Sequence, residues 1–135
     1  KEESLSFTID DVSTLPEEVD WTTQGVTTPV KDQGHCGSCW AFATSAVVES
    51  HVAIKTGLLF TMSPQQLVSC VPNPHHCGGN GGCEGSTFEI ALDYIKDNGL
   101  TGEFRMGYTS YYGDDGECSS DAMKVAGATR DESLP

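Results

Sequence analysis

The stretch QGHCGSCW, residues 33–40, stands directly before the longest helical pattern of the chain. The pattern predicts a helix from Ser38 to Thr56 with one buried stripe. That stripe would consist of aromatic, small and aliphatic residues at helical spacing: Trp40, Ala43, Val47, Ser50 and Ile54. Gly57 follows where a left-handed helix terminus favours glycine. Residues 33–40 therefore lead into a long buried helix, and Cys39 lies in its first turn.

Cys39 is placed where a cysteine becomes nucleophilic. The unpaired N–H groups and the positive dipole end of a helix favour a thiolate, and the thiolate is the form that attacks. Gln33 lies six residues earlier across a glycine-bearing turn. Its side-chain amide is expected to reach the same place as the backbone N–H of Cys39, which predicts a site for a developing oxyanion. Gly34 and Gly37 let a substrate backbone approach closely.

A shorter helix is predicted from Ser63 to Cys70. Ser63 can cap it, Pro64 suits the first helical position, and Gln66 would complete a capping box. The residues that follow, VPNPHHCGGNGGCEG at 71–85, are rich in glycine, proline and asparagine. This composition predicts a loop, and we expect cysteines to pin it.

A third helix is predicted from Ser86 or Thr87 to Asn98. Ser86 and Glu89 would form a capping box, and Gly99 is the stop signal. Its apolar face would comprise Phe88, Ala91, Leu92 and Ile95. After Gly99 the pattern weakens into short extended pieces and turns, so the second half of the chain is expected to be mostly irregular.

Composition narrows the function classes. The chain has 135 residues, 37% of them hydrophobic, which suits one domain or part of a larger one. Seven basic against twenty acidic residues give a net charge of -13. This balance excludes a generic nucleic-acid binder and argues against anionic membrane surfaces. No apolar run is long enough to span a bilayer, so we expect neither nucleic acid nor membrane as a partner.

Six cysteines favour a secreted or vesicular compartment. Cys36 and Cys39 form a C-x-x-C motif, which leaves two minor alternatives open. A redox motif would follow a buried strand, and nothing before Gln33 has that pattern. A zinc site would add ligands from later in the chain, at a separation and in a glycine-rich setting that fit no standard finger: His75, His76 and Cys77. We therefore expect no metal and no cofactor.

The motif CGSCW followed by a helix is the signature of papain and cathepsin-type cysteine peptidases. The resemblance continues through LPEEVDWTTQGVTTPVKDQGHCGSC at 15–39, SPQQLVSC at 63–70, GCEGSTFEIALDY at 82–94 and YTSYYGDDGEC at 108–118. It covers residues 15–135. It implies an α+β, papain-like fold in which this chain forms mainly the helical left domain, facing a β-barrel-like domain across a cleft.

The resemblance also implies roles for matching residues. Cys39 would be the nucleophile, Gln33 the oxyanion-hole side chain, and Trp40 would pack behind the nucleophile. The residues expected to border or bind substrate are Gly37, Ser38, Gly85, Ser86, Thr87 and Phe88. Of these, Thr87 and Phe88 would line the pocket for the second substrate residue on the acyl side. Ser86 stands where the family usually has a second glycine, which puts that backbone contact in question.

The family's disulfide pairing implies two bridges: Cys36–Cys83 and Cys70–Cys118. Cys39 must then stay free to react. Cys77 is left without a partner inside NPHHCGGNGG at 73–82, an insertion that shorter family members lack. We expect Cys77 to pair with a cysteine outside this chain or to remain a free loop thiol.

The domain organisation implied by the resemblance is incomplete. Residues 1–14 are expected to be a propeptide remnant or extended arm, and 15–135 the left domain with the start of its connection to a right domain. The family's catalytic His and Asn lie about 130–150 residues after the nucleophile, whereas the chain ends at Pro135. We expect this chain to be inactive alone and to need the other half, or a second chain.

The function implied is hydrolysis of peptide bonds through a thioester acyl-enzyme. Its partners would be polypeptide substrates, the other half, and a propeptide or protein inhibitor. The acidic surface and the cysteines favour a lysosome or vacuole, with secretion second. A second hypothesis is a non-catalytic structural or binding component built on half of the peptidase fold. The intact pair of Gln33 and Cys39 argues against it.

Overall fold

The structure, a computed structural model, describes residue 8 and residues 11–119. Two short 3-10 helices and three α-helices follow one another: η1 (Val12–Thr14), η2 (Trp21–Gln24), α1 (Cys39–Thr56), α2 (Pro64–Cys70) and α3 (Phe88–Asn98). Among the described residues β-pairing is limited to two isolated bridges, Gly37 with Glu84 and Met62 with Gly102. The three predicted α-helices are thus confirmed, and the described chain has the helical character expected of the left domain.

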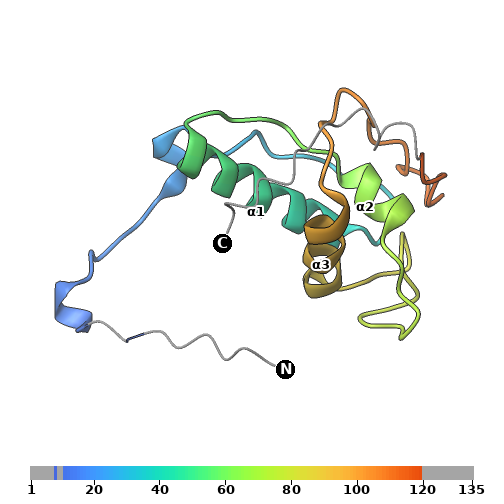
Figure 1. Cartoon of the computed structure of the whole chain (residues 1–135), viewed down its shortest axis with the longest axis horizontal. Coiled ribbons are helices and arrows are strands. Elements are labelled where there is room, and N and C mark those ends of the chain that lie inside the picture. Colours follow the sequence, from blue (N-terminus) through green and yellow to red (C-terminus); the bar gives the residue numbers. More distant parts are fainter. Residues whose placement is uncertain (1–7, 9–10, 120–135) are drawn as a thin grey trace.

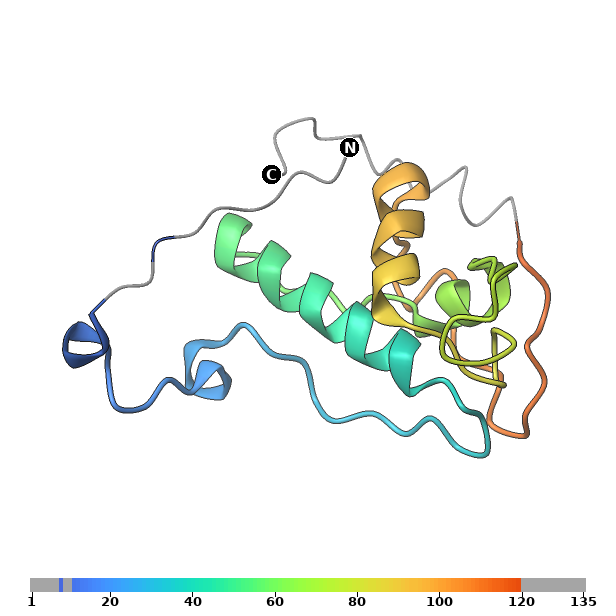
Figure 2. The ribbon, with the colours of Figure 1, turned by 90° about the horizontal axis from the view of Figure 1, so that it is seen from below.

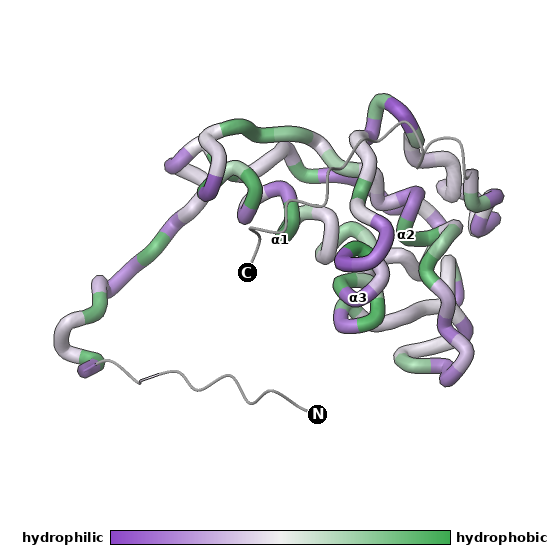
Figure 3. The backbone as a smooth tube through the Cα atoms, viewed as in Figure 1, coloured by the Kyte–Doolittle hydropathy of each residue, from purple (hydrophilic) through white to green (hydrophobic). Residues whose placement is uncertain are grey.

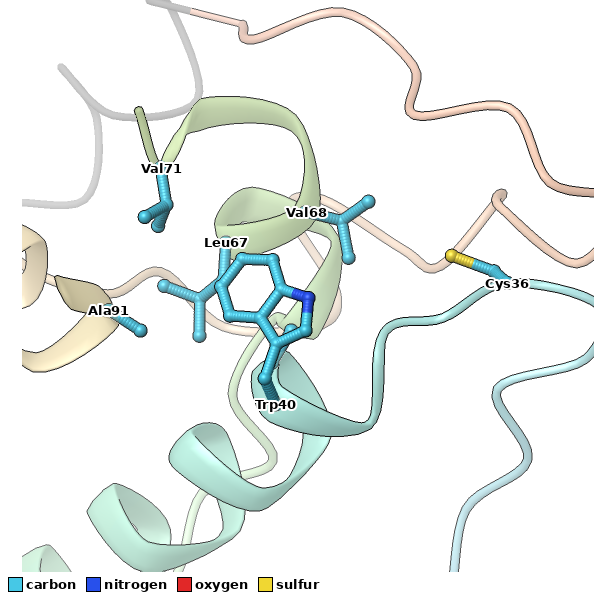
Figure 4. Packing of buried hydrophobic residues seen from close by; sticks show 7 residues of the cluster. Cys36, Trp40, Leu67, Val68, Val71 and Ala91 are labelled. Carbon is cyan, nitrogen blue, oxygen red and sulfur yellow. The ribbon is translucent and has the colours of Figure 1, made fainter. Parts of the chain in front are cut away.

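The core lies where the three α-helices meet. Figure 2 shows α3 standing against the N-terminal half of α1, with α2 beyond it. Side chains from all three helices and from the loop before α1 fill the space between them (Figure 4): Cys36, Trp40, Ala41, Leu67, Val68, Val71 and Ala91. The core therefore lies at the end of α1 that carries Cys39 and leaves the other end of the helix outside it.

The buried face of α1 differs from the predicted stripe. Of the predicted positions Trp40 is buried and Ser50 is half-buried, whereas Ala43, Val47 and Ile54 are exposed. The residues that are actually buried include polar ones: Trp40, Ala41, Thr44, Ser45, Glu49 and Ala53. Apolar residues occur all around α1, so hydropathy alone does not identify the face that packs. Within the described chain the predicted stripe therefore holds at Trp40 and is wrong at Ala43, Val47 and Ile54, because polar side chains with internal partners determine the buried face.

Glu49 is the clearest case. Its side chain is 1% exposed, and both carboxylate oxygens have partners. Oε1 accepts a hydrogen bond from the Met62 backbone N–H at 2.8 Å. Oε2 accepts from the Thr28 hydroxyl at 2.6 Å and from the Lys31 ammonium at 3.3 Å. A buried carboxylate is tolerated only when it is paired in this way, so Glu49 fastens two distant segments to α1.

Half of the predicted capping box of α2 is formed. The Ser63 hydroxyl accepts from the Gln66 backbone N–H at 3.1 Å, as expected. The Gln66 side chain, however, turns inward instead of returning to the Ser63 N–H. Its amide nitrogen donates to the Gly99 carbonyl and the Tyr94 hydroxyl, and its oxygen accepts from the Thr101 N–H at 2.7 Å. Gln66 therefore joins α2 to the end of α3.

The start and the apolar face of α3 also differ from the prediction. Thr87 is the N-cap and makes no side-chain capping bond, and the buried Ser86 hydroxyl has no hydrogen-bond partner among the described residues. The predicted Ser86–Glu89 capping box is therefore wrong. Of the predicted apolar face, Ala91 and Ile95 are confirmed, whereas Phe88 and Leu92 are exposed; Ile90 and Tyr94 complete the packed face. Gly99, at φ 76°, ends the helix as predicted.

Residues 71–85 form the predicted loop, with Cys83 bonded to Cys36.

An apolar segment, Leu58 to Phe60, follows α1 and is exposed (Figure 3). Among the helices of the described residues, none combines the length and hydropathy that a membrane span requires.

Candidate active site

Cys39 is the first residue of α1, and its thiol is free and exposed. Ser38 is the N-cap, and its carbonyl accepts from the N–H groups of Ala41 and Phe42 at 2.9 and 3.1 Å. The Cys39 N–H lies in the first turn, so it has no acceptor inside the helix. An exposed thiol and an unused backbone donor therefore occur on one residue at the positive end of the helix dipole.

Gln33 is held by contacts at both its backbone and its side chain. Its amide nitrogen donates to the Cys36 carbonyl at 2.7 Å, and its own carbonyl accepts from the Tyr108 hydroxyl at 2.6 Å. A primary amide carries two N–H donors, so one remains for another acceptor. The turn between Gln33 and Cys36 thus presents a fixed amide donor on the loop that leads to Cys39.

The segment that contains Cys83 and Glu84 lies beside the loop before α1 and is bonded to it. The Cys36–Cys83 disulfide joins the two, and the Gly37 N–H donates to the Cys83 carbonyl at 2.8 Å. Gly37 and Glu84 form a parallel bridge. A Cβ atom on Gly37 would come within 2.5 Å of the Cys83 carbonyl oxygen, so this approach requires glycine.

Trp40 links the helix to the same segment. Its side chain packs between α2 and α3 in the core (Figure 4). Its indole N–H donates to the Gly82 carbonyl at 3.0 Å. The residue after the thiol is therefore both a core residue and a hydrogen-bond link to the segment at 82–88.

The segment at 82–88 contains the remaining predicted contact residues. Gly85 has φ 96°, and its carbonyl accepts from the Gly81 N–H at 2.7 Å. Thr87 is half-buried, and Phe88 is 55% exposed at the start of α3. Ser86 has no positive φ, since His76 is the one non-glycine residue of the described chain that does. The serine that replaces the expected glycine therefore causes no left-handed strain.

The structure thus brings two groups of predicted residues side by side. Gly37 and Ser38 lie on the loop before α1, and residues 85–88 lie on the neighbouring segment, with the Gly37–Glu84 bridge between them. The exposed thiol of Cys39 follows directly on the first group.

Tyr108 is a site residue that sequence reasoning missed. Its hydroxyl contacts the Gln33 carbonyl at 2.6 Å and the Ser38 hydroxyl at 2.9 Å. Its ring packs edge-on against Phe42 and Tyr111. Burial raises the pKa of this hydroxyl above its ordinary value, which is itself well above neutral pH. The contact joins residues 70 and 75 positions apart, and no local pattern marks it.

Asp115 is a second residue near the site that was not predicted from the sequence. One of its carboxylate oxygens accepts from the Cys83 N–H at 2.6 Å, and its backbone carbonyl accepts from the Ser69 hydroxyl and the Gln65 amide. Gln65 also accepts from the backbone N–H groups of Thr109 and Ser110. This network holds residues 109–115 against α2 and the segment that carries Cys83.

The cysteines exclude two of the interpretations left open by the sequence. Cys36 bonds to Cys83 and not to Cys39, so neither a C-x-x-C redox pair nor a zinc-binding thiolate pair forms there. Cys70 bonds to Cys118, and Cys77 is a half-buried free thiol on its loop. The described part of the chain holds no group of three or more His, Cys, Asp or Glu arranged to bind a metal ion.

Comparison with known proteins defines the class. Residues 15–134 match the papain family cysteine proteases. Digestive cysteine proteinase 1 of Homarus americanus is 48% identical over 93 residues, which is 69% of this chain and 28% of that protein. Procathepsin L of Mus musculus is 48% identical over 85 residues, which is 63% of this chain and 24% of that protein.

A solved structure agrees. A recombinant stem bromelain precursor superposes with a TM-score of 0.71 at 36% identity, covering 85% of this chain and 36% of that one. The chain belongs to the papain family of cysteine proteases. It spans about a quarter of the length of the two curated relatives named above.

Proposed function

We propose that this chain is the nucleophile-bearing half of a papain-type cysteine endopeptidase. Cys39 is the nucleophile, and the Gln33 amide and the Cys39 N–H bind the oxyanion. One observation carries the proposal: an exposed free thiol at the first turn of α1 follows a disulfide-closed loop that also presents the Gln33 amide. Both oxyanion donors belong to a rigid frame, which is what makes such donors effective.

The reaction proceeds in two steps. The Cys39 thiolate attacks the substrate carbonyl carbon, and the carbonyl oxygen takes the negative charge. The C–N bond then breaks, and the amine leaves with a proton from a general acid, so that a thioester remains on Cys39. Water, deprotonated by the same group, attacks the thioester and releases the carboxylic acid and the thiol. No cofactor takes part in this chemistry.

The proton carrier is proposed to come from the remainder of the protein. None of the described histidines is hydrogen-bonded to Cys39. His51 lies twelve residues further along α1, which at 1.5 Å per residue is about 18 Å away. The apolar residues on the outer face of α1 support a covering domain, since Ala43, Val47 and Ile54 are all exposed. Residues 15–135 are then the left domain.

Residues 1–14 are proposed to be the end of a propeptide or an extended arm, and most of them lie outside the described residues. The name of the mouse relative, procathepsin L, supports a precursor form. Most of the proposed connection to the right domain also lies outside the described residues, which end at residue 119. A propeptide or a protein inhibitor is accordingly a proposed partner.

The substrate is proposed to be an extended polypeptide. It would lie along Gly85 and Ser86 by backbone hydrogen bonds, with Thr87 and Phe88 at the pocket for the second residue on the acyl side. Gly37 and Ser38 would border the reacting bond, and Trp40 would support the thiol from the core. The exposure of Phe88 and the absence of left-handed strain at Ser86 support this use of the segment.

A lysosome or vacuole is the proposed compartment, with secretion second. The two disulfides require an oxidising route. The net charge of -13 fits an acidic compartment, because partial protonation relieves repulsion between carboxylates. The name of the Homarus americanus relative, digestive cysteine proteinase 1, fits the secreted alternative.

The test is alkylation of the full-length protein with a peptidyl epoxide that traps activated thiols, followed by mass spectrometry of peptides. We expect one adduct, on Cys39, together with hydrolysis of a fluorogenic peptide. A Cys39→Ser variant should lose both, whereas a Cys77→Ser variant should keep both. Absence of an adduct on a folded protein would favour the non-catalytic component built on half of the peptidase fold.

A further inference from the structure

The Tyr108 hydroxyl lies between the two residues that bring the oxyanion donors to the site. It contacts the Gln33 carbonyl at 2.6 Å and the Ser38 hydroxyl at 2.9 Å. Gln33 carries the side-chain donor. The Ser38 carbonyl belongs to the same peptide unit as the Cys39 N–H, the second donor. The Tyr108 hydroxyl therefore connects the two residues, Gln33 and Ser38, whose positions fix the two oxyanion donors.

The hydrogen-bond directions follow from the available protons. A phenol has one proton, and the Gln33 carbonyl can only accept, so Tyr108 donates to it. The Ser38 hydroxyl must then donate to the Tyr108 oxygen. Ser38 is fully buried, so water does not compete for this contact. The result is a directed chain from Ser38 through Tyr108 to Gln33.

The position of the hydroxyl is itself fixed by packing. The Tyr108 ring meets Phe42 at 4.8 Å and Tyr111 at 4.7 Å between ring centroids, both edge-on. Phe42 belongs to α1, the helix that starts at Cys39. The backbone N–H of Tyr108 donates to the Glu103 carboxylate at 3.0 Å. The bridge is therefore attached to the same rigid unit as the thiol.

We propose that Tyr108 is a positioning residue for the oxyanion site, acting through Gln33 and the Ser38–Cys39 peptide unit. This inference rests on the proposed function. Removing an oxyanion donor costs about 100- to 1,000-fold in kcat. Loosening a donor that remains present should cost less, on the order of tenfold. Because the ground-state substrate does not fill the oxyanion position, KM should change little.

The experiment compares hydroxyl-deleting variants of the full-length protein in peptide hydrolysis. Tyr108→Phe keeps the ring and removes the bridge, and we expect kcat to fall about tenfold with KM within about twofold. Ser38→Ala, which removes only the upstream donor, should give a smaller loss in kcat. Tyr111→Phe is the matched control, because it removes a hydroxyl from the same aromatic cluster without touching Gln33 or Ser38, and its kcat should equal that of the wild type.

Combining Tyr108→Phe with Gln33→Ala tests whether Tyr108 acts by positioning Gln33 or only by stabilising the fold. If Tyr108 acts through Gln33, the double variant loses less than the product of the two single losses. Multiplicative losses, or an unchanged kcat in Tyr108→Phe beside a Gln33→Ala variant that does lose rate, would overturn the positioning role alone. A wild-type protein that hydrolyses no peptide, or a Gln33→Ala variant at full rate, would overturn the proposed function and this inference together.

Discussion

Two segments rich in polar residues differ in how they are held: residues 33–40, which lead into the first turn of α1, and residues 11–25, which contain η1 and η2. The first is tied to distant parts of the chain through His35, Gly37 and Trp40, which bond to Tyr111, Cys83 and Gly82. The second is exposed throughout and runs out on the side remote from α2 and α3 (Figures 1 and 2). Even its tryptophan, Trp21, is 50% exposed.

The difference lies in the range of the contacts. Between residues 11 and 25 the hydrogen bonds are local: Asp11 and Asp20 each accept from the residue two positions later. Such turns form from sequence neighbours and need no core. Around residues 33–40 the three contacts just named each close a loop of more than 40 residues, for example the 42 positions between Trp40 and Gly82. A reactive site needs such contacts in addition to local bonds like that from Gln33 to Cys36, because long-range contacts fix the loop relative to the rest of the molecule.

Among substitutions that test this difference between the two segments, the largest effect on activity is expected at the Cys39 thiol. Cys39→Ser should lower kcat/KM by about a thousandfold or more, since an alcohol at this position is a much weaker nucleophile. The free energy of unfolding should change little, because the side chain is exposed. Steady-state hydrolysis and urea unfolding measure the two quantities. Thr22→Val in residues 11–25 should leave the rate of hydrolysis unchanged, and a rate loss there would contradict the contrast.

The two disulfides separate stability from site geometry. They close loops of nearly equal length, 47 and 48 positions, so replacing either pair by serine should cost about 4 kcal/mol on the loop-entropy estimate. Loss of Cys36–Cys83 should also slow alkylation of Cys39, because it frees the site loop. Loss of Cys70–Cys118 should leave the alkylation rate of folded protein nearly unchanged. Equal slowing by both would show that the site depends only on global stability.

Substituting one glycine in each segment compares the two segments directly. Gly37→Ala places a Cβ about 2.5 Å from the Cys83 carbonyl oxygen, and we expect a loss of about 1–3 kcal/mol in stability together with lower kcat. Gly25→Ala meets no atom within 4 Å but must adopt φ 70°, which costs about 1–2 kcal/mol and should leave kcat unchanged. Chemical unfolding and peptide hydrolysis test the pair. Unchanged kcat in Gly37→Ala would argue against its place beside the substrate.

The smallest effect is a pH dependence within residues 11–25. Hydrogen bonds from the Thr22 hydroxyl and N–H hold the pKa of Asp20 below its ordinary value of 3.8. A depressed folded pKa means that the turn is stabilised above the unfolded pKa and loses this stabilisation as pH falls through the folded value. Titration of the Asp20 carboxyl carbon by NMR should show the low pKa. Thr22→Val should move it upward, and an unmoved titration would exclude the hydroxyl as the main cause.

Much of the local structure could be predicted from neighbouring residues. Gly57 and Gly99 end α1 and α3 where expected, and Ser63 with Pro64 starts α2. These signals work because backbone conformation and capping depend on adjacent residues. The predicted capping partners failed for a different reason. Gln66 and Ser86 sit at capping positions, but the side chain of Gln66 meets better partners on the end of α3.

The family, the thiol at a helix start and the residues that accompany it could be inferred from the chain alone, because CGSCW and each of the other motifs are short runs of neighbouring residues. Tertiary structure alone decided which face of α1 is buried, since Glu49 is solvated or paired according to where Thr28, Lys31 and Met62 come to lie. It also decided that Tyr108 reaches Gln33. Such contacts depend on the free energy of closing long loops over a packed core, and this free energy cannot be predicted from a local sequence pattern.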